Sequence, residues 1–408
     1  MTKYSGIYLV LMATCATIAG TAKAATISPF LVSDQGRDQI VLSNDLNGDG
    51  DMNDAGETTV FYGAGNASGI IGGAGNVFAL SQTSSGHVVI GDGDTDTVYR
   101  LRDNNQNGTA QDAGEAQVWF SGAANASGFK LNTPNGIAEG PDGAIYVVEA
   151  DTSGSPTGDW VYRTEDKNGD GDANDAGEAT QWLNLKALNA ASSPFEIRFD
   201  GDTAYVIDSV GATPNAIYTA TDKNGDGVIG AGEVATFASD ANSYGAIFDF
   251  AMDVGGGSVW TWQWLPELGL SSLFSLTDLD TSGSIDAASE VREVWNTTLL
   301  DSAYTFFAGF GLDRNDATGE ILITSNDTAA NGDWIVRLFD GDGDGAFWGA
   351  GETDVVLSRF DQGTYPDRAR NVSFYVAPVP LPASLPLLLG AVAGLAFLRR
   401  RKSSAMAL

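Results

Sequence analysis

Six similar acidic loops recur along the chain, and their regular spacing limits the possible folds more than any other feature. Each begins Asp-x-[Asp/Asn]-x-[Asp/Asn/Ser]-Gly and ends on a glutamate. The six loops, numbered in chain order, run Asp45–Glu57, Asp103–Glu115, Asp166–Glu178, Asp222–Glu233, Asp278–Glu290 and Asp340–Glu352. Their first residues lie 58, 63, 56, 56 and 62 positions apart. A period of this size indicates one supersecondary unit repeated along the chain.

The residues around each loop are typical of short β-strands. Val98–Leu101 precedes the second loop, and Gln117–Phe120 follows it. Upstream of each loop a further pair of strands surrounds a turn, most clearly Gly136–Ala138 and Ile145–Val148 on either side of Pro141-Asp142-Gly143. Each unit is therefore predicted to contain four antiparallel strands, a to d, with the acidic loop between strands c and d. Such units, when repeated, are typical of propeller blades.

The two ends of the repeated region predict how the ring closes. Only two strands fit before the first loop, Pro29–Val32 and Gln39–Leu42, and one fits after it, Thr59–Tyr62. One more strand, Asn371–Val376, remains after the last loop unit. Together these four strands would complete a sixth blade and leave no open sheet edge. We therefore expect an all-β, six-bladed β-propeller over residues 25–377, with a β-solenoid or a row of small sandwiches as the alternatives.

The acidic loops have the composition of calcium sites. Oxygen-bearing side chains at alternate positions point inward as the chain curls, and the glycine at position six permits the sharp turn, as in an EF-hand loop. Asp, Asn and Glu offer only hard oxygen ligands, which suit calcium better than zinc or copper. The predicted ligands are Asp45, Asn47, Asp49, Asp51, Asp54, Glu57, Asp103, Asn105, Asn107, Asp112, Glu115, Asp166, Asn168, Asp170, Asp172, Asp175, Glu178, Asp222, Asn224, Asp226, Glu233, Asp278, Asp280, Ser282, Glu290, Asp340, Asp342, Asp344 and Glu352.

Two features distinguish these loops from EF-hands. Strands flank them in place of helices, so no helix pair can open as a sensor. Five of the six place the final glutamate at position thirteen, and only Asp222–Glu233 has the EF-hand spacing of twelve. The thirteenth residue is therefore either an outer ligand or a strand cap, with Asp54 or Asp175 as the replacement ligand. The alternative for the whole set is an acidic turn that holds no ion.

Charge and cysteine content narrow the class of protein further. The chain has 53 acidic and 21 basic residues, and six of the basic residues lie in the two terminal segments. This balance argues against nucleic acid or anionic lipid as a direct partner. The only cysteine is Cys15, inside the N-terminal segment described next. Disulfides therefore cannot stabilise the body of an exported protein here, and bound metal is the usual substitute.

Both ends of the chain are predicted to be targeting segments. Lys3, the apolar stretch from Ile7 to Ala19 and the small residues of Ala22-Lys23-Ala24 form a signal peptide, residues 1–24. A membrane anchor would need a longer apolar run, and Met12-Ala13-Thr14 before Cys15 is a poor lipoprotein signal.

The C-terminal segment, residues 378–408, has three parts. Val379-Pro380-Leu381-Pro382-Ala383 is followed by an apolar run from Leu385 to Leu398 and by the basic cluster Arg399–Lys402. This order resembles the PEP-CTERM sorting signals of Gram-negative bacteria, in their VPLPA variant. The resemblance implies processing by an exosortase, and hence an inner-membrane precursor whose body moves to the cell surface or extracellular matrix. A plain transmembrane tail anchor is the alternative, with the basic cluster cytoplasmic in either case.

A possible active site would lie at the mouth of the propeller channel. The stretch Gly136–Val147 resembles NHL and gluconolactonase-type propellers, which implies a metal held by Glu, Asn and Asp at the starts of the innermost strands. The corresponding positions here are Asn76, Asn135, Glu196, Asp249, Gly309 and Asn371. The order of residue types differs from that family, and a channel lined with water-holding polar groups is the alternative. His87 is the only histidine, so a His-rich zinc site is excluded, and it follows the turn Ser84-Ser85-Gly86, which argues against a Ser–His triad.

Two functions are consistent with these features. The first is a calcium-binding surface or matrix scaffold that binds glycan or protein. The second is a metal-dependent hydrolase of lactones or phosphoesters, with its ion at the channel mouth.

Overall fold

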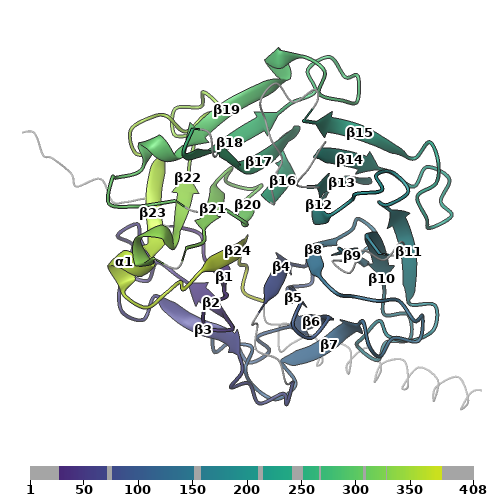
Figure 1. The fold of residues 1–408 in the computed structure, drawn as a ribbon. Helices are drawn as coiled ribbons and strands as arrows, with labels where there is room; N and C mark the ends of the chain where they lie inside the picture. Colours follow the sequence, from purple (N-terminus) through teal and green to yellow (C-terminus); the bar gives the residue numbers. More distant parts are fainter. Residues whose placement is uncertain are drawn as a thin grey trace, which may run out of the picture.

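The computed structural model describes residues 27–70, 76–150, 158–209, 215–240, 251–265, 268–306, 309–327 and 329–378. They form six four-stranded antiparallel sheets arranged in a ring, which confirms the predicted six-bladed β-propeller (Figure 1). No helix in these ranges is long and apolar enough to span a membrane. The predicted signal peptide, residues 1–24, and the apolar run Leu385–Leu398 lie outside the described residues.

Each blade is named here by its order in the chain. Blade 1 contains β24 (Ala369–Phe374), β1 (Phe30–Asp34), β2 (Gln39–Ser43) and β3 (Thr58–Gly63). Blade 2 contains β4 (Val77–Gln82), β5 (Val88–Asp92), β6 (Thr97–Leu101) and β7 (Ala116–Ser121). Blade 3 contains β8 (Pro134–Glu139), β9 (Ile145–Glu149), β10 (Trp160–Thr164) and β11 (Ala179–Asn184). Blade 4 contains β12 (Pro194–Asp200), β13 (Thr203–Asp208), β14 (Ala216–Ala220) and β15 (Val234–Ser239).

The last two blades and the short helices complete the described chain. Blade 5 contains β16 (Ala251–Gly255), β17 (Ser258–Leu265), β18 (Leu270–Leu276) and β19 (Val291–Asn296). Blade 6 contains β20 (Leu312–Arg314), β21 (Ile321–Ser325), β22 (Trp334–Leu338) and β23 (Thr353–Ser358). The helices are α1 (Arg359–Gln362) and the 3-10 turns Ala288–Glu290, Thr297–Leu299 and Ala330–Gly332.

The ring closes as the sequence predicted. In blade 1 the C-terminal strand β24 pairs antiparallel with β1, with Phe30 opposite Phe374 and Val32 opposite Val372. One sheet therefore joins the two ends of the propeller. The closing strand begins at Ala369, two residues earlier than predicted from Asn371.

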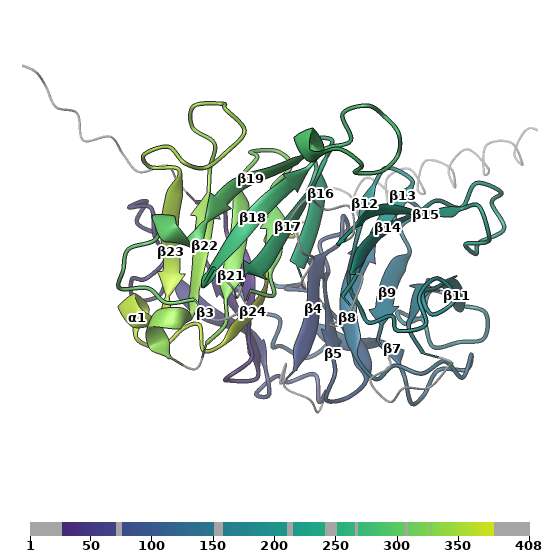
Figure 2. The ribbon, with the colours of Figure 1, turned by 45° about the horizontal axis from the view of Figure 1, so that its top comes forward.

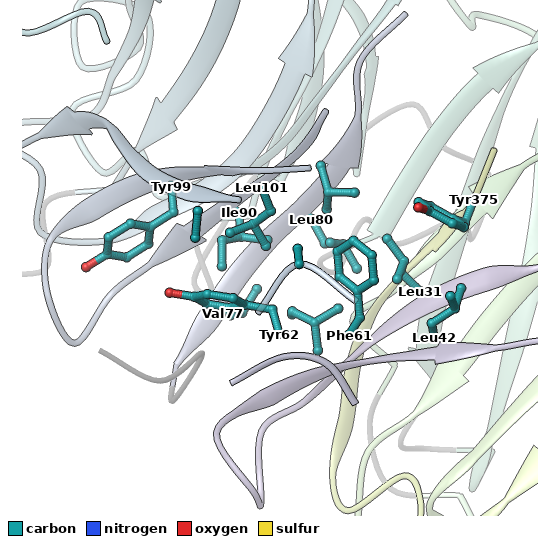
Figure 3. Packing of buried hydrophobic residues seen from close by; sticks show 14 residues of the cluster. Leu31, Leu42, Phe61, Tyr62, Val77, Leu80, Ile90, Tyr99, Leu101 and Tyr375 are labelled. Atoms are coloured by element: carbon teal, nitrogen blue, oxygen red, sulfur yellow. The ribbon is translucent and has the colours of Figure 1, made fainter. Parts of the chain in front are cut away.

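The hydrophobic core is divided among the spaces between neighbouring blades. In one cluster Phe61 of blade 1 lies with Val77 and Leu80 of blade 2, and its ring packs edge-on against Tyr375 at 5.5 Å between centroids (Figure 3). The alternating apolar residues of each strand point to the two faces of the sheet, so every blade contributes to two such clusters.

The innermost strand of each blade faces a central channel, and Figure 2 shows β4, β8, β12 and β16 around it. Glycine permits some of these strands to approach one another closely. A Cβ atom on Gly136 of β8 would lie 2.8 Å from Cα of Glu196 in β12. A Cβ on Gly311, just before β20, would lie 2.7 Å from the carbonyl oxygen of Arg370 in β24.

Candidate functional site

Each acidic loop connects the third strand of its blade to the fourth, at the outer side of the ring. Strands a and c of a blade run in the same direction, so these loops lie at the end of the propeller where the innermost strands finish. We call this the loop end. The predicted channel mouth, where the innermost strands start, is at the opposite end.

The first half of each loop is fixed by backbone hydrogen bonds to its own acidic side chains. In the third loop, the N–H groups of Gly169 and Gly171 donate to the two carboxylate oxygens of Asp166 at 2.6 and 2.9 Å. The N–H of Asp170 donates to Oδ1 of Asn168 at 2.8 Å. Equivalent bonds hold the fourth loop, where Asp222 accepts from its two glycines at 2.7 and 2.9 Å. These bonds turn the side chains of positions one, three and five to the inner side of the curl.

The final glutamate of every loop fixes the second half. Oε1 of Glu178 accepts from the N–H groups of Lys167 and Asn168 at 3.0 and 3.3 Å, and Oε2 accepts from Asp175 at 3.1 Å. The six glutamates are all buried: Glu57, Glu115, Glu178, Glu233, Glu290 and Glu352. Glu233, at position twelve, makes the same contacts with Lys223, Asn224 and Gly230. The glutamate carboxylate therefore binds both ends of the loop backbone whether it stands at position twelve or at position thirteen.

In two of these loops the carboxylates lie close enough together to hold a metal ion. The carboxylates of Asp278, Asp280 and Glu290 approach within 4.8 Å of one another, as do those of Asp340, Asp342 and Glu352. These are the two loops with Asp at position three, and the other four have Asn there, whose amide oxygen is also a hard ligand. Calcium takes six to eight such oxygens.

Two further observations indicate uncompensated negative charge in the loops. In the first loop, Oδ2 of Asp45 is buried and has no hydrogen-bond partner among the described residues. In the fifth loop, the charge of Asp280 is the main cause that raises the pKa of Asp286. A cation within the curl would relieve both.

An apolar residue at position eight of each loop joins that loop to the preceding blade. Its N–H donates to a carbonyl oxygen of that blade's outermost strand at 2.6–2.9 Å, and we call this contact the clasp hydrogen bond. The six donor–acceptor pairs are Met52–Val356, Ala110–Phe61, Ala173–Trp119, Ile229–Trp182, Ile285–Phe237 and Phe347–Val294. Because Met52 of blade 1 donates to Val356 of blade 6, the six clasps run around the whole ring.

Every clasp acceptor lies at a β-bulge of its outermost strand. In blade 2, Val98 pairs with Phe120 and Tyr99 pairs with Val118, so Trp119 has no partner on β6. The register shifts in the same way at Phe61, Trp182, Phe237, Val294 and Val356. An extra residue in a bulge leaves its carbonyl free of the sheet ladder. The bulge therefore supplies the acceptor that the loop of the next blade requires.

The channel contains a cavity of about 680 Å³ at the loop end. All six innermost strands contribute to its wall, with Ser81, Ala138, Arg198, Asp253, Asp313 and Ser373 among the lining residues. Nη1 of Arg198 lies 2.6 Å from Oε1 of Glu196, and its Nε lies 3.4 Å from Oδ1 of Asp253. Oδ2 of Asp313 accepts from the N–H of Phe374 in the next blade at 2.7 Å.

Burial alters the acidity of these channel carboxylates. It raises the pKa of Glu196 to about 7 and that of Asp313 to about 8, and the charge of Asp253 adds to both effects. Arg198 opposes both shifts because its positive charge favours the ionised forms.

The sequence reasoning missed Asp253, Asp313 and Arg198 as channel residues. The repeat contained a signal for two of them, because Asp253 and Asp313 each lie four residues after the predicted start of an innermost strand. Those starts are Asp249 and Gly309, respectively. Arg198 belongs to no repeated motif, and only the ring brings it between carboxylates of two blades.

The predicted channel-mouth residues are not joined to one another. The amide of Asn135 donates to the carbonyl of Pro194 at 2.9 Å, and that of Asn371 donates to Phe78 at 2.6 Å. Asn76 accepts from Gln35 at 2.8 Å. Within the described ranges no hydrogen bond connects any two of Asn76, Asn135, Glu196 and Asn371, while Asp249 lies outside those ranges.

The channel mouth also contains an arginine that stacks on aromatic rings. The guanidinium of Arg370 lies 4.1 Å from the ring centroid of Phe78 and 4.7 Å from that of Phe310. Together with the amide contacts of Asn135 and Asn371 to neighbouring strands, this stack packs the inner strands together at that end.

No protein-family model matches the chain, and no curated protein matches it in sequence. Solved structures with a similar fold include virginiamycin B lyase from Staphylococcus aureus, at 17% identity over 77% of this chain and 82% of that one, with a TM-score of 0.40. A streptogramin B lyase matches at 14% identity over 86% and 85% of the two chains, with a TM-score of 0.43. The PQQ-bound aldose sugar dehydrogenase from Streptomyces coelicolor matches at 15% identity over 78% and 96%, with a TM-score of 0.45. At these values the likeness concerns the fold alone.

Proposed function

We propose that this chain is a calcium-binding surface or matrix protein, in which calcium holds the propeller rigid so that it can act as a scaffold or ligand-binding module. The observation that carries the proposal is the clasp hydrogen bond, present in all six blades and always between an acidic loop and a bulged strand. A cation that fixes the curl of a loop also fixes the N–H at position eight. Calcium would therefore stabilise contacts between blades as well as the loops themselves.

The composition supports the same conclusion. With 53 acidic residues, the folded chain experiences strong self-repulsion unless cations neutralise part of its charge. Cys15 is the only cysteine, so no disulfide can replace a metal in the body. The ligands proposed for the surface role are glycan or protein, and nucleic acid is disfavoured by the charge.

Calcium titration of chelator-treated protein, followed by calorimetry, tests this function directly. We expect binding of several ions per chain. Asp170→Asn should reduce the number of bound ions by one, or weaken one site at least tenfold, because it removes a carboxylate from the third loop. Asp202→Asn, in the exposed turn between β12 and β13, is a matched control that should leave the titration unchanged. Absence of calcium binding to folded protein would refute the proposal.

The C-terminal segment supports delivery to the cell surface. We propose that an exosortase processes it near Val379-Pro380, after the last described residue. Replacing Pro380 and Pro382 by alanine should leave an unprocessed precursor in the inner membrane, observed as a larger band in membrane fractions. Alanine replacement of Ser403 and Ser404, beyond the basic cluster, is the control. If the proline variant is processed and sorted like the unchanged chain, this part of the proposal is wrong.

A further inference from the structure

The cavity at the loop end of the channel has polar groups that the fold does not use. Arg102 lines it, and its guanidinium makes no hydrogen bond or ion pair with any described residue. Asp313 uses Oδ2 to accept from Phe374, while its Oδ1 accepts no hydrogen bond from the described chain. Oε2 of Glu139 accepts from the N–H of Ser84 at 2.6 Å, and its other oxygen has no such donor. Donors and acceptors therefore both remain available in one cavity.

The charges around the cavity nearly balance, although the chain as a whole is strongly acidic. The ionisable side chains in its wall are the basic Arg102, Arg198 and Arg314 and the acidic Glu139, Asp253, Asp313 and Asp316. Three basic groups against four acidic groups attract neither a simple cation nor a simple anion strongly. This balance contrasts with 53 acidic and 21 basic residues in the whole chain.

The position of a divalent metal ion in this cavity is already taken by protein groups. Oδ1 of Asp253 accepts from the N–H of Val254 at 2.7 Å and lies 3.4 Å from Nε of Arg198. Its Oδ2 accepts from the N–H of Arg314 at 2.7 Å. The guanidinium of Arg198 thus lies between Glu196 and Asp253, where an ion shared by these carboxylates would have to bind.

We propose that this cavity binds a neutral polyhydroxylated ligand, a sugar of one or two rings. Each hydroxyl group both donates and accepts, so adjacent hydroxyls can satisfy a carboxylate and a guanidinium together. The volume of about 680 Å³ is in the range of small-ligand sites. This proposal rests on the ligand-binding role proposed above, for which it names a class of ligand. It does not depend on the calcium sites, since none of the residues that line the cavity is a predicted calcium ligand.

One wall of the cavity is the end of the described chain, Val376–Pro378. This segment is held in place by Gln82, whose amide donates to the carbonyl of Val376 and accepts from its N–H, both at 2.8 Å. Gln106 donates to the carbonyl of Pro378 at 2.8 Å. These contacts hold one wall of the cavity in place.

The test is binding of glucose, cellobiose and maltose to the full, calcium-loaded chain, measured by saturation-transfer NMR and calorimetry. Methylammonium and acetate serve as charged probes of the same cavity. We expect saturable binding of at least one sugar, weakened at least tenfold by Arg102→Gln and by Asp313→Asn. Lys130→Gln, which changes an exposed cation outside the cavity, should bind like the unchanged chain.

Several outcomes would overturn the inference: no sugar binds the folded protein, only a charged probe binds, or Arg102→Gln leaves sugar binding intact. Because Arg102 has no partner in the described chain, Arg102→Gln should fold normally, and an unchanged melting temperature checks this. Calcium binding by the same samples is measured separately. Failure of the sugar site and failure of the calcium scaffold are therefore distinguishable.

Discussion

Excess chelator is expected to lower the melting temperature of the propeller strongly. A ligand that binds only the folded state stabilises it by about 2.7 kcal/mol per site at a hundredfold excess over its dissociation constant. Six acidic loops, each with a clasp hydrogen bond to the preceding blade, could make this the largest single contribution to stability. Removing calcium would also restore repulsion among the loop carboxylates, which acts in the same direction. Differential scanning calorimetry with and without chelator measures the effect.

Hydrogen exchange would show which parts of the propeller are destabilised when calcium is removed. Without calcium, the clasp donors at position eight should lose protection before the amides of the innermost strands do. The donors include Ile285, whose N–H lies 2.6 Å from the carbonyl oxygen of Phe237. Magnesium at the same ionic strength is the control, because it requires stricter octahedral geometry than these loops are expected to provide. A melting temperature that does not respond to the chelator would contradict the calcium hypothesis.

The repeat contained most of the information needed to predict the fold. Six loops spaced 56 to 63 residues apart, with flanking β-formers, predicted six blades, and the surplus strand near Asn371 predicted the closing sheet. Both were confirmed. The strand bounds were less accurate at the closing strand, which starts at Ala369, because pairing with β1 extends it beyond its own apolar pattern.

The contacts between blades could not be predicted in the same way. The apolar residue at position eight of each loop, such as Ala173, was visible in the sequence, but its acceptor at Trp119 depends on a bulge in another blade. Likewise, Asn135 has the residue type of a metal ligand, yet its amide bonds to the neighbouring Pro194. Residue type and spacing predict which groups are available. Only the assembled ring determines which of them meet.

Replacing Arg198 by methionine is expected to destabilise the protein by about 3–5 kcal/mol at alkaline pH, because this change breaks a buried ion-pair network. Arg198 lies 2.6 Å from Glu196 and 3.4 Å from Asp253, and its side chain is 13% exposed. Methionine fills much of the same volume. The main loss is therefore that of the positive charge, which leaves two buried carboxylates without their shared cation.

The dependence of this loss on pH separates charge from packing. Burial already raises the pKa of Glu196 to about 7 in the folded protein, above its ordinary value of 4.5. A carboxyl group whose pKa is higher in the folded than in the unfolded state binds its proton more tightly when the protein is folded. The free energy of unfolding therefore falls as the pH rises from the pKa of the unfolded state to that of the folded state. Without Arg198 the pKa of Glu196 in the folded protein should rise further, and the decline in stability should continue to higher pH.

The stability of the variant should therefore differ little from that of the unchanged chain near pH 5 and most above pH 8, measured by denaturant unfolding at saturating calcium. Adding Glu196→Gln should recover part of the loss at pH 8, whereas equal destabilisation at both pH values would mean that Arg198 acts through packing alone.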